Sequence, residues 1–142
     1  MGASAVLLFA LPASPLAQPW SIIGGNLIAA VVGITCAKLI ATPILSVALA
    51  GGLAIALMMR FRCLHPPSGA VALTAILGGS QVSELGYQFV FSPVLVNSLL
   101  LVMLAIIFNL LAKRDYPHHP KIPQKSTKDV GEITLEDVEK AL

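Results

Sequence analysis

The sequence predicts an all-α, polytopic transmembrane protein, and its composition and charge distribution carry that prediction. Of the 142 residues, 56% are hydrophobic and 11% are charged, and the mean hydropathy is +0.86. About a quarter of the residues in a soluble domain are charged. Before Lys113 the only charged side chains are Lys38, Arg60, Arg62 and Glu84. We therefore expect an integral membrane protein with three clear spans plus short half-helices, followed by a soluble tail.

The first apolar segment is too short to cross a bilayer. Residues 1–9 are almost wholly apolar, and Pro12, Pro15 and Pro19 follow them. A helix needs roughly 20 apolar residues to span the hydrocarbon core, so this segment predicts a half-helix. Trp20 is a candidate anchor at the membrane interface, where tryptophan is enriched.

Three longer stretches predict full spans, namely residues 22–40, 43–59 and 91–111. The first is rich in glycine and alanine, which permit close helix packing in membranes. Pro43 suits the first turn of the second span. Arg60 and Arg62 mark the exit of that span from lipid, and Lys113 and Arg114 close the third span. Residues 80–88 are polar and too hydrophilic to lie in lipid.

A break in the chain at residues 63–69 separates the second span from another short segment. Pro66 and Pro67 remove two backbone donors and disfavour helix at the residues before them. Ser68 is a candidate N-cap for a half-helix over residues 69–77, which Gly78 and Gly79 end. Irregular backbone at membrane depth must be buried in protein or line a wet cavity, so we expect the break to face a pathway. The alternative is a proline-rich loop outside the membrane.

The two half-helices suggest an internal repeat. Residues 2–8 and 69–75 share a small-then-large apolar pattern, and Asn26 in the first span would then correspond to Asn97 in the third. If the second half-helix is re-entrant, the repeat is parallel. If it completes a crossing, the repeat is inverted and Arg60, Arg62, Lys113 and Arg114 share one side, which fits the positive-inside rule better.

The tail changes in composition at Asp115, so we expect a membrane domain over residues 1–114 and a soluble region over 115–142. The soluble region begins as a proline-containing linker, and its residues 133–142 predict a short amphipathic helix with Thr134 as N-cap. His118 and His119 are expected to be solvated, and Cys36 and Cys63 to behave as small hydrophobic side chains. No metal site and no cofactor are expected.

These residues resemble the HPP family of integral membrane proteins, named for the triplet at residues 65–67. The resemblance runs through residues 2–9, 14–19, 24–25, 64–70 and 93–95. It implies a pattern of four spans and, from plant and cyanobacterial members, nitrite transport. Some bacterial members carry cystathionine-β-synthase-type regulatory domains, and residues 133–138 are similar to the connector before them. Against that pattern, we expect one span to be missing at the start and the regulatory domain to be missing at the end.

The expected function is that of a membrane transporter or channel for a small anion, which by resemblance is nitrite. Backbone N–H groups at helix starts, hydroxyls and amides can bind such an anion without trapping it. The candidate pathway residues are Gly2, Ala3, Ser4, Asn26, His65, Pro66, Pro67, Ser68, Gly69 and Asn97.

Three further side chains have two interpretations each. Arg60 and Arg62 lie either at the pore mouth or serve only to set topology. His65 is either a proton relay or oxyanion donor, or an interfacial imidazole that caps the broken helix. The alternative function is a structural or sensory membrane anchor for a downstream regulatory domain.

No catalytic set of nucleophile, base and acid is present, so we expect no enzyme. The expected partners are the lipid bilayer, a small inorganic anion and further copies of the chain, with no nucleic acid. The expected location is the bacterial inner membrane.

Overall fold

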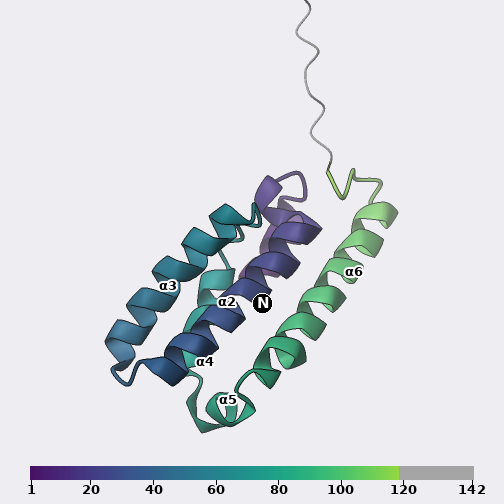
Figure 1. Cartoon of the computed structure of the whole chain (residues 1–142). Coiled ribbons are helices and arrows are strands. Elements are labelled where there is room, and N and C mark those ends of the chain that lie inside the picture. The colour runs from purple at the N-terminus through teal and green to yellow at the C-terminus, as the bar shows by residue number, and fades with distance from the viewer. Residues whose placement is uncertain (119–142) are drawn as a thin grey trace, which may run out of the picture.

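The computed structural model describes residues 1–118 as a bundle of helices, with no strand in that range (Figure 1). The predicted amphipathic helix and its cap at Thr134 lie outside the described residues, as does His119. In chain order the elements are α1 (Gly2–Ala10), η1 (Pro15–Ala17), α2 (Pro19–Leu39), α3 (Pro43–Arg60), α4 (Ser68–Leu77), α5 (Gly79–Leu85), the π-helix η2 (Val90–Leu95) and α6 (Val96–Leu111).

Three helices are long and apolar enough to cross a membrane, as the sequence predicted. They are Pro19–Leu39, Pro43–Arg60 and Val90–Leu111. The first begins three residues earlier than expected because Pro19, whose fixed φ suits the first turn of a helix, starts it. The polar stretch at residues 80–88, which was expected to avoid lipid, includes most of α5 (Gly79–Leu85), in which no residue is buried.

The third span is kinked near its start, a feature that the sequence analysis did not anticipate. Ser92 has φ −131° and ψ 114°, which are not helical angles, and Pro93 follows it inside η2. Proline lacks the N–H that a helix interior needs and clashes with the preceding turn, so regular α-helix begins only at Val96. Pro93 was the signal for this kink.

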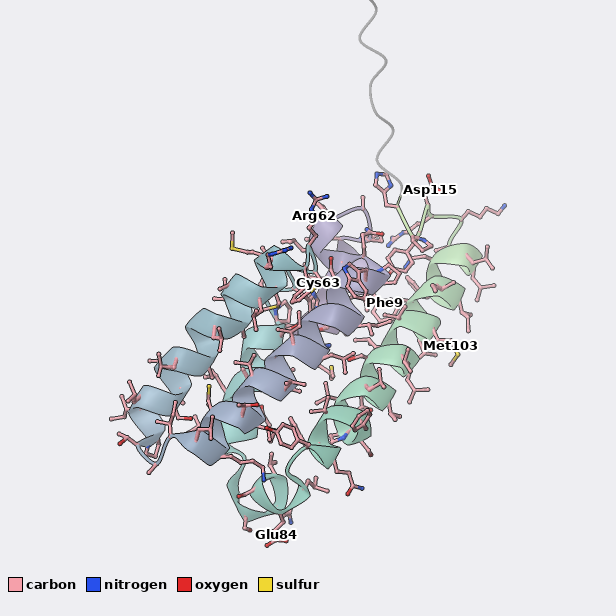
Figure 2. All side chains as sticks on the ribbon, viewed as in Figure 1. Phe9, Arg62, Cys63, Glu84, Met103 and Asp115 are labelled. Carbon is pink, nitrogen blue, oxygen red and sulfur yellow. The ribbon has the colours of Figure 1, made fainter. Side chains whose placement is uncertain are left out.

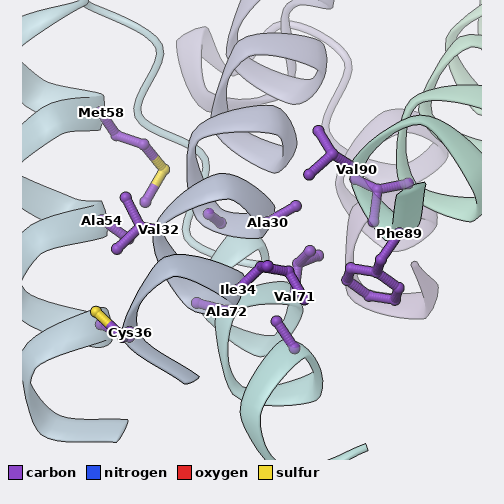
Figure 3. Packing of buried hydrophobic residues seen from close by; sticks show 14 of the residues in the cluster. Ala30, Val32, Ile34, Cys36, Ala54, Met58, Val71, Ala72, Phe89 and Val90 are labelled. Carbon is purple, nitrogen blue, oxygen red and sulfur yellow. The ribbon is translucent and has the colours of Figure 1, made fainter. Parts of the chain in front are cut away.

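The core forms where α2 packs against α3 on one side and α4 on the other. Figure 3 shows Val32 and Ile34 from α2 between Met58 of α3 and Val71 of α4. Small residues on α2 permit this contact. A Cβ at Gly33 would lie 2.7 Å from the Ala72 carbonyl oxygen, so α4 approaches closely only because Gly33 has no side chain.

The two ends of the bundle are defined by contacts between distant segments. At the first, the Arg62 end, Trp20 Nε1 donates to the Phe61 carbonyl (3.2 Å) and Arg114 Nη1 donates to the Phe9 carbonyl (2.9 Å). At the other, the Glu84 end, the Thr35 and Tyr87 hydroxyls lie 3.1 Å apart. Figure 2 shows Arg62 and Asp115 at one end and Glu84 at the other. Between Arg62 and Glu84 the chain therefore runs from one end of the bundle to the other, as the inverted arrangement requires.

The half-helices begin near the middle of the bundle and run to opposite ends. In Figure 1 the N-terminus of α1 lies about half-way along α2 and α6; α1 runs to the Arg62 end and α4 to the Glu84 end. Each half-helix packs against the span that follows the other half-helix: α4 packs on α2, and α1 packs on α6. This is the arrangement expected of an inverted repeat of a half-helix followed by a span.

Candidate functional site

Five buried polar side chains meet where the two half-helices begin, and we call them the polar network. They come from α1, α2, α6 and the segment that joins the break to α4, and each is at most 1% exposed. The members are Ser4, Asn26, His65, Ser68 and Ser98. Four of them were predicted as pathway residues. Ser98 was not, because a serine in an apolar helix gives no signal of its partner.

His65 joins the break to the tip of α1 and to η1. Its Nδ1 lies 2.8 Å from the Leu16 carbonyl oxygen, and its Nε2 lies 2.8 Å from Ser4 Oγ. A carbonyl can only accept, so Nδ1 carries the proton, and in the neutral ring Nε2 accepts from the Ser4 hydroxyl. His65 is 0% exposed, so protein encloses its ring, and its predicted roles as relay, oxyanion donor or interfacial cap stay predictions.

Asn26 is the second centre of the polar network and links three helices. Its Oδ1 accepts from Ser68 Oγ at 2.8 Å, and its Nδ2 donates to Ser98 Oγ at 3.0 Å. Ser98 Oγ in turn donates to the Val94 carbonyl oxygen at 2.8 Å. Because buried polar groups are costly unless they are paired, these bonds fix α2, α4 and α6 relative to one another.

The start of α4 differs from its predicted form. Pro67 is the N-cap and Ser68 is the first helical residue, so Ser68 makes no cap bond and turns its hydroxyl to Asn26. The Gly69 amide donates to the Pro66 carbonyl at 3.1 Å, and the Ala70 amide donates to the Pro67 carbonyl at 3.2 Å. These amides are engaged within their own turn, so they are not open donors for an anion.

Glycine on α2 makes room for the break. A Cβ added at Gly25 would lie 2.8 Å from His65 Cβ, 2.9 Å from the Cys63 carbonyl oxygen and 3.0 Å from Ser68 Oγ. Such distances are shorter than van der Waals contact, so only glycine fits there. Gly25 therefore lets the break approach α2 closely, and the hydrogen bond from Ser68 to Asn26 fixes it there.

An open pocket of about 170 Å³ lies beside the polar network, and we call it the central cavity. Eight residues line it: Met1, Ala70, Val71, Thr74, Phe89, Pro93, Val94 and Asn97. Asn97 is the only predicted pathway residue among them. The expected equivalence of Asn97 with Asn26 does not extend to their contacts, because it is Ser98 that bonds Asn26 while Asn97 is exposed at the central cavity.

The remaining predicted residues fall into two places. Gly2 and Ala3 form the exposed first turn of α1, whose Ser4 joins the polar network. Arg60 and Arg62 are exposed at the Arg62 end, away from the central cavity. No group of three or more His, Cys, Asp or Glu side chains that could hold a metal ion is found within residues 1–118.

Segments 11–18 and 113–118 are tied together at the Arg62 end. The Tyr116 hydroxyl donates to the Ala17 carbonyl oxygen at 3.0 Å, and the His118 amide donates to Gln18 Oε1 at 2.9 Å. Burial raises the pKa of Tyr116 to about 12, since the phenolate is poorly solvated there. The Leu16 carbonyl, which binds His65, lies directly before Ala17 and Gln18 in the chain.

Comparison with known proteins agrees with the fold. The family model for the HPP transmembrane region matches residues 1–117. Two transmembrane proteins of Dictyostelium discoideum are 42% and 41% identical to this chain over 120 residues, or 81% of its length. The match covers 42% and 38% of those proteins, so the chain spans about two fifths of the length of each. No solved structure matches the chain.

Proposed function

The chain belongs to the family of HPP transmembrane regions, and from that premise we propose that it is a transporter or channel for a small anion, with nitrite as the first candidate. The observation that carries the proposal is the meeting of two half-helices in the middle of the bundle. Both α1 and α4 begin there, beside the polar network and the central cavity, and they run to opposite ends.

The electrostatics of this meeting point support passage of an anion. The positive ends of two helix dipoles point inward, and each is worth about half an elementary charge. No charged side chain lines the central cavity, and the one charged group on a lining residue is the α-amino group of Met1. A conducting site must attract the ion without holding it, so partial charges suit a small monovalent anion better than a lysine or arginine would.

The pathway need not pass through His65. Its ring nitrogens are both occupied, and Ser4 and Ser68 are engaged as well. On the proposed function the polar network holds the two half-helix tips in place, while the central cavity next to it receives the solute. On this proposal His65 is a structural residue that holds the half-helix tips, and it is not a proton relay.

Flux into proteoliposomes is the test. The purified chain is reconstituted, and uptake of nitrite, formate, nitrate and chloride is compared with uptake into protein-free vesicles of the same lipid. Protein-dependent uptake of nitrite supports the proposal. Equal uptake with and without protein, for all four solutes, would leave the membrane-anchor function as the better account.

The alternative function, an anchor for a regulatory domain, draws on the contacts at the Arg62 end. Segment 113–118 is bonded to segment 11–18, so a domain attached after residue 118 would be connected to the loop that holds His65. A transporter regulated through this connection would combine both functions. Flux measured with and without residues 119–142 distinguishes a regulated pathway from a passive anchor.

We propose further that the chain works as a homo-oligomer in the bacterial inner membrane and that it catalyses no reaction. Apolar side chains of α6 are widely exposed, including Leu99, Leu104 and Leu110, and a second copy could cover them. The resemblance of residues 133–138 to the connector of bacterial members favours that membrane. Cross-linking in native membranes, with fractionation of the producing cell, tests the assembly and the location together.

A further inference from the structure

The central cavity is lined by uncharged groups, and only two of its side chains hydrogen-bond strongly. These are Thr74 from α4 and Asn97 from α6. The other lining residues are alanine, valine, phenylalanine, proline and methionine. A water molecule needs only about 10–15 Å³ of such space, so about 170 Å³ accepts a small oxyacid and some water.

Thr74 can present only an acceptor to this cavity. Its Oγ1 donates to the Ala70 carbonyl oxygen at 2.7 Å, which uses the single hydroxyl proton. Its free lone pairs repel an anion and accept from a ligand that carries an O–H. Asn97 can both donate and accept through its amide. The pair therefore matches a ligand with one donor and one acceptor.

We infer that the species bound in the central cavity is the uncharged conjugate acid of a small oxyanion, whose O–H donates to Thr74 and whose oxygen accepts from Asn97. This rests on the proposed function and specifies its substrate. The anion takes up one proton from water on one side, crosses as the acid, and releases that proton on the other side. Each turnover moves one anion and one proton, so no net charge crosses.

The surroundings of the central cavity are also mainly apolar. A second, shallow hollow on the exposed face of α4 shares Ala70 and Thr74 with the central cavity and extends past Leu73 and Leu77 to Gly78, at the Glu84 end of α4. This continuation has Thr74 as its only hydroxyl. Such a route penalises a charged solute because it offers little to replace water around the charge, whereas a neutral acid has much less to lose.

Few titratable groups lie near Thr74 and Asn97. None of the eight lining side chains ionises, and His65 is enclosed in the polar network behind the tip of α1. The α-amino group of Met1 belongs to a lining residue, so a chain with two alanines added before Met1 is included as a control that moves this charge. The expected pH dependence of uptake therefore comes from protonation of the solute. It does not require titration of a carboxylate or imidazole of the protein.

The experiment uses the full chain in proteoliposomes and measures uptake after subtraction of protein-free vesicles. Nitrite and formate, which form neutral acids, are compared with nitrate, whose acid is fully dissociated in water. A potassium diffusion potential set with valinomycin is then applied. We expect protein-dependent uptake of nitrite and formate that rises as external pH falls, is unchanged by the potential, and is absent for nitrate. The chain with the two added alanines should behave in the same way.

Variants of two threonines locate the effect. Thr74→Val should reduce nitrite uptake about tenfold, and Thr74→Ser should retain it. Thr35→Val is the matched control, since Thr35 also donates to the carbonyl four residues earlier, Val31, but does not line the central cavity. Uptake of nitrate, or acceleration of nitrite uptake by an inside-positive potential, would overturn the inference and leave the proposed function standing. Full activity of Thr74→Val would also overturn it, and no protein-dependent uptake of any solute would overturn both.

Discussion

The hydroxyl of Ser68 donates a 2.8 Å hydrogen bond to Oδ1 of Asn26, although 42 residues separate them in the sequence. Both side chains are 0% exposed. The bond attaches the first residue of α4 to the middle of α2, so it holds one half-helix tip at a fixed depth. It is also the link between the break and α6, because Asn26 donates to Ser98.

A double-mutant cycle on Asn26 and Ser68 should show strong coupling. Asn26→Ala leaves the Ser68 hydroxyl without an acceptor, and a buried unpaired polar group costs about 1–3 kcal/mol. Ser68→Ala should then cost much less in the Asn26→Ala background than in the native chain. Thermal unfolding in detergent measures the four proteins, and additive effects would contradict the bond.

Gly25→Ala should destabilise the protein because the new methyl group would collide with His65 Cβ, the Cys63 carbonyl oxygen and Ser68 Oγ. Overpacking of this kind costs about 1–3 kcal/mol. Gly52→Ala on α3 is the control: no atom lies within 4 Å of the added Cβ. Because alanine favours helix over glycine by about 1 kcal/mol, that variant should be as stable as the native protein or more so. Melting temperatures that fall equally would count against the close packing of the break.

His65→Ala should lower stability by about 1–3 kcal/mol for each partner left unpaired, and those partners are Ser4 and the Leu16 carbonyl. His65→Asn places an amide N–H near the position of Nδ1, so it should keep the bond to Leu16 and recover part of the loss. The expected melting temperature is highest for the native protein, intermediate for His65→Asn and lowest for His65→Ala. Native stability in both variants, with loss of flux alone, would restore the relay role.

The inverted arrangement predicts on which side each end of the bundle lies. Arg60, Arg62, Lys113 and Arg114 gather at the Arg62 end, so the positive-inside rule places that end in the cytoplasm. A cysteine at Ser83, exposed at the Glu84 end, should react with an impermeant maleimide in intact cells. A cysteine at Ala13, exposed at the Arg62 end, should react only after lysis. The native Cys36 and Cys63 are buried and serve as the background.

Tyr116 should titrate late. With its pKa raised to about 12 from 10.0, the folded protein keeps the phenol neutral while the unfolded chain ionises, so stability is lost as pH rises from about 10 to about 12. Near-ultraviolet absorbance should show a tyrosinate step near pH 12. Tyr116→Phe should abolish that step and Tyr87→Phe should preserve it. A late step of this kind that survives in Tyr116→Phe would mean that Tyr116 is not its source.

The architecture was predictable from the sequence because prolines and glycines punctuate long apolar stretches. Pro43 begins α3, Gly78 follows the last residue of α4, and the pair at residues 66–67 keeps the break out of helical geometry. These are local conformational effects of proline and glycine, so they can be predicted from the sequence alone. The shortness of α1 and α4 was likewise visible as two apolar segments of about half the length of a span.

Which polar groups of the site hydrogen-bond to one another was less predictable from the sequence. On an α-helix one residue corresponds to a rotation of about 100°, so Asn97 and Ser98 face different surroundings although they are neighbours. The kink at Ser92 and Pro93 sets that rotation, and no local pattern fixes its angle. The Leu16 carbonyl was equally invisible, since backbone acceptors carry no residue signature.

The gathering of charged side chains at the two ends has a consequence for the response to voltage. Within residues 1–118, Lys38 and Glu84 mark one end, and the arginines, Lys113 and Asp115 mark the other. Moving one elementary charge through a membrane potential is worth about 2.3 kcal/mol per 100 mV. The interior, built from hydroxyls, amides and a neutral imidazole, displaces no such charge when it rearranges. The electric field would therefore do almost no work on the protein interior itself, and on the proposed function any voltage dependence of flux would come from the charge of the solute.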